Sequence, residues 1–381
     1  MNATHTIKVL HVYKTYYPDT VGGVEAVIEQ ICTASQPLGI QSQVLTLSQE
    51  AHPIEHNAVT VHRAHLDLEL ASTGFSWQFI FMLKRLAKEV DVVHYHFPWP
   101  FMDMAHFLAR VKKPTVLTYH SDIVKQKNLL KVYRPLMNQF LKSVDCIVAT
   151  SPNYLETSEV LQRFKHKTRT IPIGLDRNSY PQPSNERLIE WRSKLPTQFF
   201  LFVGVLRYYK GLHTLLEALA SCDYPTVIAG TGPEAHQLQL QAKQLGLKNI
   251  IFLGKVSELD KFALLQQCFA FVFPSHLRSE AFGISLLEAA MYGKPLISCE
   301  IGTGTTYINI NQETGITLPP ESPIALQQAM QRLWDHPNIA REMGVAAQAR
   351  YNELFTSQKT TEQYVELYRM LTNEKASNEQ D

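Results

Sequence analysis

The sequence has few cysteines, and they are scattered along the chain. There are five in 381 residues, an odd number, and most stand among apolar residues, as in the run after Cys146. A framework of disulfide bonds or a closed zinc site needs cysteines at paired spacings. We therefore expect buried, reduced thiols at Cys32, Cys146, Cys222, Cys268 and Cys299.

Neither charge is in excess, and no apolar run is long. The 36 Lys and Arg residues balance 35 Asp and Glu residues, so no overall field would hold the protein on nucleic acid or an anionic bilayer. Any basic patch must be local. No uncharged apolar stretch approaches the ~18 residues of a membrane span, and no basic segment precedes an apolar one at the N-terminus. We predict a cytoplasmic protein without a nucleic-acid partner.

The sequence also lacks an Asp-x-Asp motif, and Asp67-Leu-Glu69 is the nearest approach to one. A divalent cation beside a diphosphate is therefore not expected. Four other ligands, His94, His96, His120 and Asp122, are an alternative zinc set, but no cysteine joins them and their spacing matches no closed site. We predict no metal and no cofactor.

Short apolar runs alternate with longer amphipathic ones, which is typical of βαβ units in a parallel sheet. In the first half we predict strands over residues 7–12, 43–47, 59–63, 91–96, 115–119 and 146–150, and helices over 24–33, 77–88, 102–111 and 129–143. The chain is therefore predicted to be an α/β protein. Its length is enough for two cores.

Prolines interrupt this rhythm over residues 171–196, where we place a hinge. The pattern restarts at residue 199, with strands predicted over 226–229, 250–253, 269–273 and 295–298 and helices over 212–220, 234–245, 259–267 and 285–292. Only helical pattern follows, over 326–334, 339–355 and 358–371, before a polar tail that we expect to be frayed. Two doubly wound domains follow from this repetition.

A glycine pair, Gly22-Gly23, lies in the turn between the first strand and the first helix. Glycines there let backbone N–H groups approach an anion at the helix N-terminus. An ordinary βα turn that needs a positive φ is an equally good interpretation of this pair by itself.

Two cations follow the first strand of the second half. In Gly204-Val-Leu-Arg207-Tyr-Tyr-Lys210-Gly211 they stand after the C-terminal end of a parallel strand, where such sheets bind ligands. Arginine grips phosphate oxygens in a fork and lysine supplies a point charge, so the pair suits a diphosphate leaving group. A solvated basic turn is the alternative.

The segment from Pro274 to Ala289 carries two carboxylates, Glu280 in a loop and Glu288 on the following helix. The N–H groups of Ala281, Phe282 and Gly283 are available at the helix N-terminus, and carboxylates accept hydrogen bonds from sugar and ribose hydroxyls. The segment therefore indicates polyol recognition. The alternatives are a surface helix position for Glu288 and a partner of the helix dipole for Glu280.

Two polar pairs occupy the ends of apolar strands in the first half, His94-Tyr-His96 and His120-Ser-Asp122. We expect both to face a cleft between the domains. His120 is a candidate to share a proton with an acceptor hydroxyl, because its ordinary pKa lies near neutrality. A satisfied structural histidine is the competing interpretation.

Taken together, Gly22-Gly23, His120, residues 204–211, the Gly230-Thr-Gly232 turn and residues 280–288 resemble glycosyltransferase family 4 over nearly the whole chain. The resemblance implies a retaining enzyme of the GT-B fold, with two Rossmann-like doubly wound domains facing a cleft. It implies an acceptor domain over residues 1–178, joined by a returning helix over 357–372, and a nucleotide-sugar domain over 179–356.

The resemblance also implies roles for individual residues. Glu288 would hold the ribose, and Glu280 with the loop of Ala281, Phe282, Gly283 and Ile284 would contact the donor sugar. Arg207 and Lys210 would bind the diphosphate beside Gly204, Gly22 and Gly23 would close over donor and acceptor, and His120 would bind the transferred sugar. One departure is Ile173, where the family commonly has asparagine before Gly174.

Residues 10–20 and 299–305 look more narrowly like bacterial O-antigen mannosyltransferases, which take mannose from GDP-mannose to a polyprenyl diphosphate-linked glycan in lipopolysaccharide synthesis. The guanine would then lie near Gly254 and Val256, and residues 302–306 would flank the diphosphate. A lipid-linked acceptor would keep the enzyme peripheral on the cytoplasmic face of the inner membrane. A UDP-sugar donor, a nucleotide-sugar epimerase and a non-catalytic nucleotide-sugar-binding scaffold are the alternatives.

Residues 123–143 are a candidate membrane surface. Their basic residues are interleaved with apolar ones, as interfacial helices require: Lys125, Lys127, Lys131, Arg134 and Lys142 against Leu129, Leu130, Val132, Tyr133, Leu136, Met137 and Phe140. A helix packed on the sheet with a basic outer face is equally compatible with this pattern.

Overall fold

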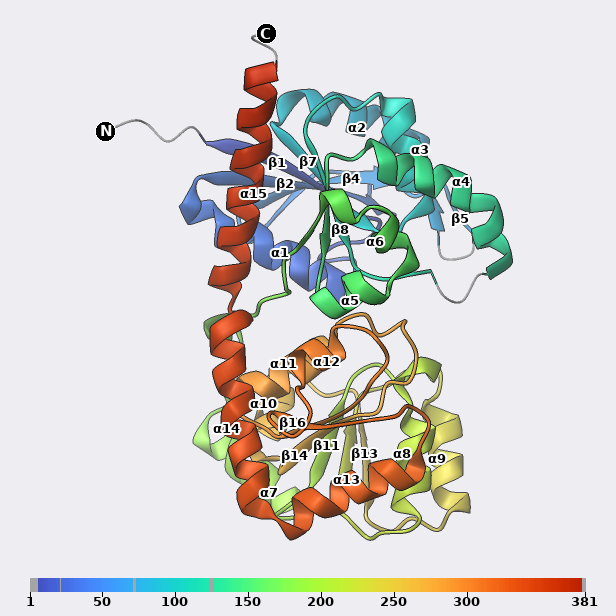
Figure 1. Cartoon of the computed structure of the whole chain (residues 1–381), viewed down its shortest axis with the longest axis vertical. Coiled ribbons are helices and arrows are strands. Elements are labelled where there is room, and N and C mark those ends of the chain that lie inside the picture. Colours follow the sequence, from blue (N-terminus) through green and yellow to red (C-terminus); the bar gives the residue numbers. More distant parts are fainter. Residues whose placement is uncertain (1–5, 21, 71–72, 124–126, 379–381) are drawn as a thin grey trace. The chain divides into compact units, whose positions relative to one another are not determined.

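The computed structural model describes residues 6–20, 22–70, 73–123 and 127–378, and the chain divides into two compact units (Figure 1). The first unit comprises residues 1–174 and 357–381, and the second comprises residues 175–356. The chain therefore passes to the second unit inside the proline-rich segment of residues 171–196 and returns before the last helix.

The first unit is built on an eight-stranded sheet in the order β10-β9-β8-β7-β1-β2-β4-β3. Its strands are β1 (Ile7–Val12), β2 (Ile40–Ser48), β3 (Ile54–His56), β4 (Val59–His65), β7 (Val92–Phe97), β8 (Thr115–Tyr119), β9 (Cys146–Ala149) and β10 (Thr168–Thr170). All pair in parallel except β3, which lies antiparallel at the edge. The order reverses between β1 and β7, as it does in a doubly wound sheet.

The helices of the first unit come from both ends of the chain. They are α1 (Gly23–Ser35), α2 (Trp77–Glu89), α3 (Pro100–Ala109), α4 (Lys127–Ser143), α5 (Pro152–Thr157), α6 (Glu159–Arg163) and α15 (Ser357–Asn378). Helix α15 packs beside α1 and buries Tyr364 and Tyr368. We expected the tail from residue 372 to be frayed, but the helix continues to Asn378.

The second unit has a parallel sheet in the order β13-β12-β11-β14-β15-β16. The strands are β11 (Phe200–Val203), β12 (Thr226–Ala229), β13 (Ile250–Gly254), β14 (Ala270–Phe273), β15 (Leu296–Cys299) and β16 (Gly315–Leu318). Its helices are α7 (Asn185–Lys194), α8 (Leu212–Leu219), α9 (Ala235–Gln244), α10 (Glu258–Gln267), α11 (Ile284–Met291), α12 (Thr305–Ile308), α13 (Pro323–Asp335) and α14 (Pro337–Leu354).

Three of these elements were not predicted: α7, β16 and the single-turn helix α12. Helix α7 lies within the segment that the prolines marked as a hinge, because the Ser184 hydroxyl caps it and the Arg187 guanidinium bonds Asp260 of α10 at 2.6 Å. Strand β16 is only four residues long and opens with Gly315, which packs against the carbonyl of Leu296 too closely for any side chain. A strand of four residues is too short for its hydrophobic periodicity to be recognised in the sequence.

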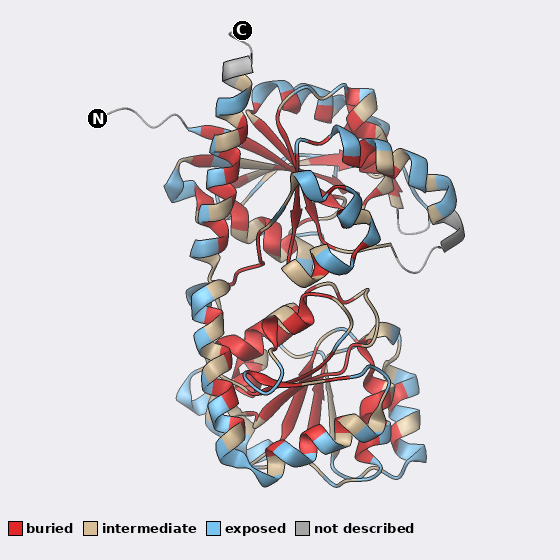
Figure 2. Cartoon of the chain, viewed as in Figure 1, coloured by how far each residue is buried: buried red, intermediate tan, exposed pale blue. Residues whose placement is uncertain are grey.

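Both faces of each sheet are buried (Figure 2). The strands β1, β7, β8, β11, β12, β14 and β15 consist almost wholly of buried residues, as parallel strands between helices require. All five cysteines are free thiols, as predicted, but Cys222 is partly exposed whereas the other four are buried.

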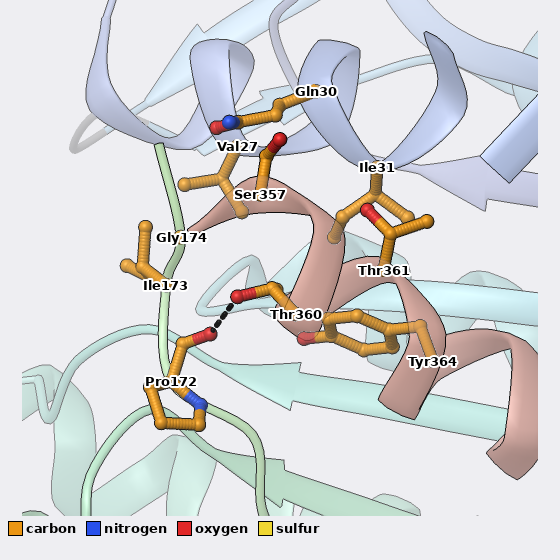
Figure 3. Close-up of a pocket in the computed structure, with 10 residues that line it drawn as sticks. All are labelled: Val27, Gln30, Ile31, Pro172, Ile173, Gly174, Ser357, Thr360, Thr361 and Tyr364. Atoms are coloured by element: carbon orange, nitrogen blue, oxygen red, sulfur yellow. Dashed lines mark hydrogen bonds between the residues drawn. The ribbon is translucent and has the colours of Figure 1, made fainter. Parts of the chain in front are cut away.

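Ile173 lines a small cavity where the chain leaves the first unit (Figure 3). The side chain is 6% exposed and lies with Val27 and Ile31 of α1 around a space of about 10 Å³. The Thr360 hydroxyl of α15 donates to the carbonyl of Pro172 at 2.8 Å. An apolar residue therefore fits this position, where the family commonly has asparagine.

Replacing Ile173 with asparagine is expected to destabilise the protein by about 1–3 kcal/mol, because a buried amide would replace an apolar side chain that lies with Val27 and Ile31. The conservative change Ile173→Val should cost less, about 0.5–1.5 kcal/mol. Urea unfolding of both variants measures the difference. Equal stability of Ile173→Asn and the native protein would show that the cavity accommodates a polar group.

Candidate active site

The predicted donor-binding residues of the second unit follow the C-terminal ends of adjacent strands. The strand order reverses between β11 and β14, and this is the place where open parallel sheets bind ligands. Arg207 and Lys210 come after β11, and Glu280 comes after β14. The sheet thus brings together, at one edge, residues that are about seventy positions apart in the sequence.

Glycines allow the turns at this edge to pack backbone against backbone. A side chain on Gly211 would begin 1.9 Å from the carbonyl oxygen of Pro274, and one on Gly230 would begin 1.9 Å from that of Gly204. Gly211 and Gly230 also have positive φ angles. These contacts hold the turn after β11 between the turns after β12 and β14.

Lys210 and Glu280 form an ion pair across this edge. The Lys210 ammonium lies 2.5 Å from Glu280 Oε2, which also accepts a bond of 3.2 Å from the Ser275 hydroxyl. The ammonium lies 4.7 Å from the centroid of the Phe273 ring, and both charged side chains are 11% exposed. A pair so little hydrated is held rigidly and is costly to break from one side.

Arg207 lies in the same turn after β11, three residues before Lys210, and is exposed. Among the residues that the structure describes, no carboxylate lies within ion-pair distance of its guanidinium. The Arg207 carbonyl accepts a hydrogen bond of 3.0 Å from the Lys210 amide, which fixes the backbone of the turn. Its charge is therefore available to an anionic ligand, whereas that of Lys210 is shared with Glu280.

The loop between Glu280 and α11 presents backbone donors. In the described part of the chain, the N–H groups of Ala281, Phe282 and Gly283 donate no hydrogen bond, and Gly283 caps α11 with a φ of 96°. Ile284 is the first residue of the helix. The amide of Gly304 donates to the Ala281 carbonyl at 2.9 Å, so the segment over residues 302–306 packs against this loop, beside the position predicted for the diphosphate.

Glu288 is buried, and its partner is a lysine that the sequence analysis missed. The helix begins at Ile284, so Glu288 lies one turn inside it. It is 4% exposed and accepts a bond of 2.8 Å from Lys261 Nζ of α10. Burial raises the pKa of Glu288, and Lys261 opposes that shift. The surface position considered for Glu288 is therefore wrong. Only tertiary contact reveals Lys261, because its sequence neighbours are those of an ordinary helix.

Val256, predicted beside the nucleotide base, follows the edge strand β13. It is partly exposed, and two residues earlier Gly254 has a φ of 70° and accepts a bond of 2.8 Å from the Gly230 amide. The turns after β13 and β12 are thus joined, and β12 pairs directly with β11.

In the first unit, Gly22 and Gly23 lie where α1 begins. Gly22 is the N-cap, and a side chain there would begin 2.5 Å from Glu25 Oε2. Glu25 is 7% exposed and accepts a bond of 2.9 Å from the Thr20 hydroxyl. Gly22 has an extended φ of −156°, so the turn does not need glycine for a positive φ, and a side chain at this position would have to displace the Glu25 carboxylate.

The two polar pairs, His94 with His96 and His120 with Asp122, have different environments. His94 and His96 are completely buried inside β7, so the expectation that they face a cleft is wrong. His120 is 7% exposed and bonds His96, with 2.9 Å between their nitrogens. Asp122 accepts bonds from Tyr119 and Ser158, each of 2.9 Å, which makes it a partner of neighbouring side chains.

Two groups of residues have the spacing of possible metal ligands in the described part of the chain. They are His11 with His94 and His96, and His213 with His276 and Glu321. Neither is the set of His94, His96, His120 and Asp122 that the sequence suggested. The prediction that the enzyme needs no metal stays a prediction.

Helix α4 packs on the first unit through its C-terminal half. Met137, Phe140 and Leu141 are buried, while Lys131, Arg134 and Lys142 are exposed. This is the packed helix with a basic outer face that we set against the membrane surface. Lys125 lies outside the described residues, as do the side chains of Lys127 and Leu129. Within the described residues, the structure has no helix with the length and apolarity needed to cross a bilayer.

Sequence comparison places both halves of the chain in known families. Residues 21–179 match Glycosyltransferase Family 4, and residues 186–350 match the glycosyl transferases group 1. The chain is 60% identical over 353 residues to D-rhamnosyltransferase WbpZ of Pseudomonas aeruginosa, covering 92% of this chain and 93% of that protein. It is 46% identical over 372 residues to O-antigen chain mannosyltransferase C of Escherichia coli, covering 97% and 100%.

Solved structures support the same assignment at the level of the fold. Sucrose-phosphate synthase from Thermosynechococcus elongatus superposes with a TM-score of 0.78 at 20% identity, covering 96% of this chain and 99% of that one. WaaG, a glycosyltransferase involved in lipopolysaccharide biosynthesis, gives a TM-score of 0.70 at 17% identity, covering 94% and 99%. With two parallel-sheet units and these relatives, the chain belongs to glycosyltransferase family 4 and is a glycosyltransferase of the GT-B fold.

Proposed function

We propose that the protein is a retaining α-mannosyltransferase that moves mannose from GDP-mannose to a polyprenyl diphosphate-linked glycan in the synthesis of lipopolysaccharide O antigen. The observation that carries the proposal is the cluster at the reversal between β11 and β14, where an exposed arginine, a buried Lys–Glu pair and free loop amides meet. The name of one relative, an O-antigen chain mannosyltransferase, supports the choice of mannose.

This cluster suits a nucleoside diphosphate sugar. The exposed Arg207 guanidinium and the Lys210 ammonium supply positive charge to the diphosphate, and so stabilise the negative charge that grows on the leaving group. Glu280 and the amides of residues 281–283 offer an acceptor and donors to sugar hydroxyls. Glu288, held by Lys261, is the proposed acceptor for the ribose, and the backbone between Gly254 and Val256 is the proposed site for guanine.

For the transfer we propose front-side attack with retention of configuration. Glu280 lies against Lys210 and Ser275, an arrangement that positions a hydrogen-bond acceptor and does not free a carboxylate nucleophile. The departing phosphate oxygen would itself take the proton of the acceptor hydroxyl as the new glycosidic bond forms. His120, in the first unit, is proposed to bind the transferred sugar.

The proposed lipid-linked acceptor requires contact with a membrane, and α2 has the more suitable surface. One face of this helix carries Trp77 and Phe81, which are 73% and 70% exposed, together with the exposed Lys84, Arg85 and Lys88. Positions 77, 81, 84, 85 and 88 fall on one side of a helix of 3.6 residues per turn. Aromatic rings beside basic residues are typical of a helix that lies in the interface of an anionic bilayer.

Exchanging both aromatic residues, Trp77→Ser with Phe81→Ser, is expected to weaken binding to vesicles that contain anionic lipid by about 10- to 100-fold, because two exposed rings lose their burial in lipid. The control exchanges Ile189→Ser and Val345→Ser, which are 63% and 66% exposed in the second unit. Vesicle co-sedimentation measures both. Unchanged binding of the first variant, or an equal loss in the control, would contradict the membrane face.

The function is tested with purified protein, a synthetic polyprenyl diphosphate-linked acceptor and each of several nucleotide sugars. Acceptor mass, release of nucleoside diphosphate and the configuration of the new linkage are followed together. Gain of an α-linked hexose from GDP-mannose alone supports the proposal. A β linkage would contradict retention, and product from a UDP-sugar would keep the family but overturn the donor.

A second donor is favoured by one specific observation, the 60% identity to a D-rhamnosyltransferase. D-rhamnose is mannose without its 6-hydroxyl group, so the GDP-linked 6-deoxy sugar belongs in the same assay. A kcat/KM for it above that of GDP-mannose would assign the chain to D-rhamnose transfer. Interconversion of nucleotide sugars without an acceptor would indicate an epimerase, and tight binding without any turnover would indicate a scaffold.

A further inference from the structure

Three histidines of the first unit form a chain of hydrogen bonds across neighbouring strands. His11 Nδ1 of β1 lies 3.1 Å from His96 Nε2 of β7, and His96 Nδ1 lies 2.9 Å from Nε2 of His120, the residue that follows β8. The strands are adjacent in the order β8-β7-β1. The rings of His96 and His120 are nearly parallel, at 20°. We call His11, His96 and His120 the histidine chain.

The histidine chain runs from the protein interior towards the surface. His11 and His96 are completely buried, and only His120 has some exposure, at 7%. His94 stacks on His96 with 4.4 Å between ring centroids but is bonded elsewhere, to Tyr368 and Thr118, each at 2.7 Å. His94 therefore packs against the histidine chain but makes no hydrogen bond to its members.

Each ring of the histidine chain is neutral near pH 7. Burial lowers the pKa of His11 and that of His120 to about 3. Burial and the neighbouring histidines also place the pKa of His96 well below its ordinary value. A neutral imidazole carries one N–H, and its other nitrogen is an acceptor.

The single N–H protons of the three neutral rings can be placed along these two hydrogen bonds in only two ways. Each of the two bonds needs one N–H between its nitrogens, and His96 has a single N–H to contribute. If that proton is on His96 Nδ1, His120 Nε2 accepts and the proton of His120 is on Nδ1. If it is on His96 Nε2, His11 Nδ1 accepts and the proton of His11 must be on Nε2. The outer nitrogen of His120 is a donor in the first arrangement and an acceptor in the second.

The inner end of the histidine chain distinguishes the two arrangements. His11 Nε2 is buried and has no hydrogen-bond partner among the residues that the structure describes. In the second arrangement it would be a buried N–H without an acceptor, which is rarer in proteins than an unsatisfied acceptor. The first arrangement leaves only a lone pair unsatisfied there.

We propose that His96, backed by His11, is a positioning residue that holds His120 as its Nδ1–H tautomer, so that His120 presents a hydrogen-bond donor on the side away from His96. The donor would serve an oxygen of the nucleotide sugar, a part of the inference that rests on the proposed function. The tautomer itself does not depend on it. A metal ion on His11, His94 and His96 would instead have to displace one hydrogen bond of His94 and one of His96, because both nitrogens of each ring already make one.

The tautomers are read by NMR of the full-length protein labelled with ¹⁵N at histidine, through long-range couplings between ring nitrogens and carbon-bound protons. We expect the Nδ1–H form at His11, His96 and His120. An Nε2–H form at His120 in the native protein would overturn the proposal without any variant. Loss of these signals with one equivalent of Zn²⁺ would also overturn it, in favour of a metal site.

Two variants separate positioning from folding. In His96→Phe, His120 loses its inner donor, so we expect a mixture of tautomers and a kcat about tenfold lower, which is the typical effect of one misdirected hydrogen bond. In His96→Asn the amide nitrogen replaces Nδ1, so the Nδ1–H form of His120 and most of kcat should return. The control is His106→Phe, which removes a buried histidine bonded to Tyr95 and outside the chain.

An unchanged tautomer at His120 in a folded His96→Phe protein would contradict the positioning role. If native protein shows the Nδ1–H form but transfers no sugar from any donor, the proposed function fails and the tautomer assignment stands. If it transfers sugar with His120 in the Nε2–H form, the proposed function stands and the positioning role fails.

Discussion

Replacing Arg207 with alanine should lower kcat by about 100- to 1000-fold, the effect of removing one preorganised cationic group from a developing negative charge. The free energy of unfolding should change by less than about 0.5 kcal/mol, because the side chain is exposed and, among the described residues, has no carboxylate partner to leave unpaired. Steady-state kinetics with the active donor, together with urea unfolding, measures the two quantities on one preparation.

Arg207→Lys keeps the charge of this side chain and removes the guanidinium fork, so we expect an intermediate loss of kcat. Arg192→Ala removes another exposed arginine, in α7, and should leave both kcat and stability unchanged. Full activity of Arg207→Ala would exclude Arg207 from leaving-group stabilisation. A large loss of stability would mean that the residue supports the turn and does not act on the diphosphate.

Unlike Arg207→Ala, a variant that breaks the Lys210–Glu280 pair should lose stability as well as activity. Lys210→Met is expected to destabilise the second unit by about 3–5 kcal/mol, because it leaves the Glu280 carboxylate buried and uncompensated. The double variant, Lys210→Met with Glu280→Gln, should recover much of that loss, since no buried charge remains and Ser275 still has an acceptor. All of these variants should lack transferase activity.

A double-mutant cycle in urea measures the coupling between Lys210 and Glu280. Additive losses would show that the two charges do not depend on each other, in conflict with the short contact between their side chains. Recovery of stability without recovery of activity is the expected combination. It would separate the structural pairing of these residues from their proposed contact with the donor.

The histidines show which features of the site can be predicted from local sequence and which cannot. The motif at His120 was recognisable because it follows an apolar strand, and His94 and His96 were recognised in the same way. Their environments were not, since whether a strand residue points into the core depends on which helices cover the sheet. His11 was not singled out at all, because a polar residue within an apolar strand has no local pattern that distinguishes it.

The sequence by itself determined the fold class and provided most of the candidate site residues. Alternating apolar and amphipathic runs require parallel strands between helices, and glycine turns after strands are local features that need no long-range contact. The positions of Arg207, Glu280 and the loop amides followed from these local features together with the family resemblance.

Only the tertiary structure decided the partners of the buried charges. Lys210 meets Glu280 because β11 and β14 are neighbours at the reversal of strand order, and Lys261 meets Glu288 because α10 and α11 lie close together. The histidine chain likewise needs the order β8-β7-β1. Charges at such separations in the sequence are paired by burial, which makes an unpaired charge costly, and burial is a property of the packed sheet and not of any segment within it.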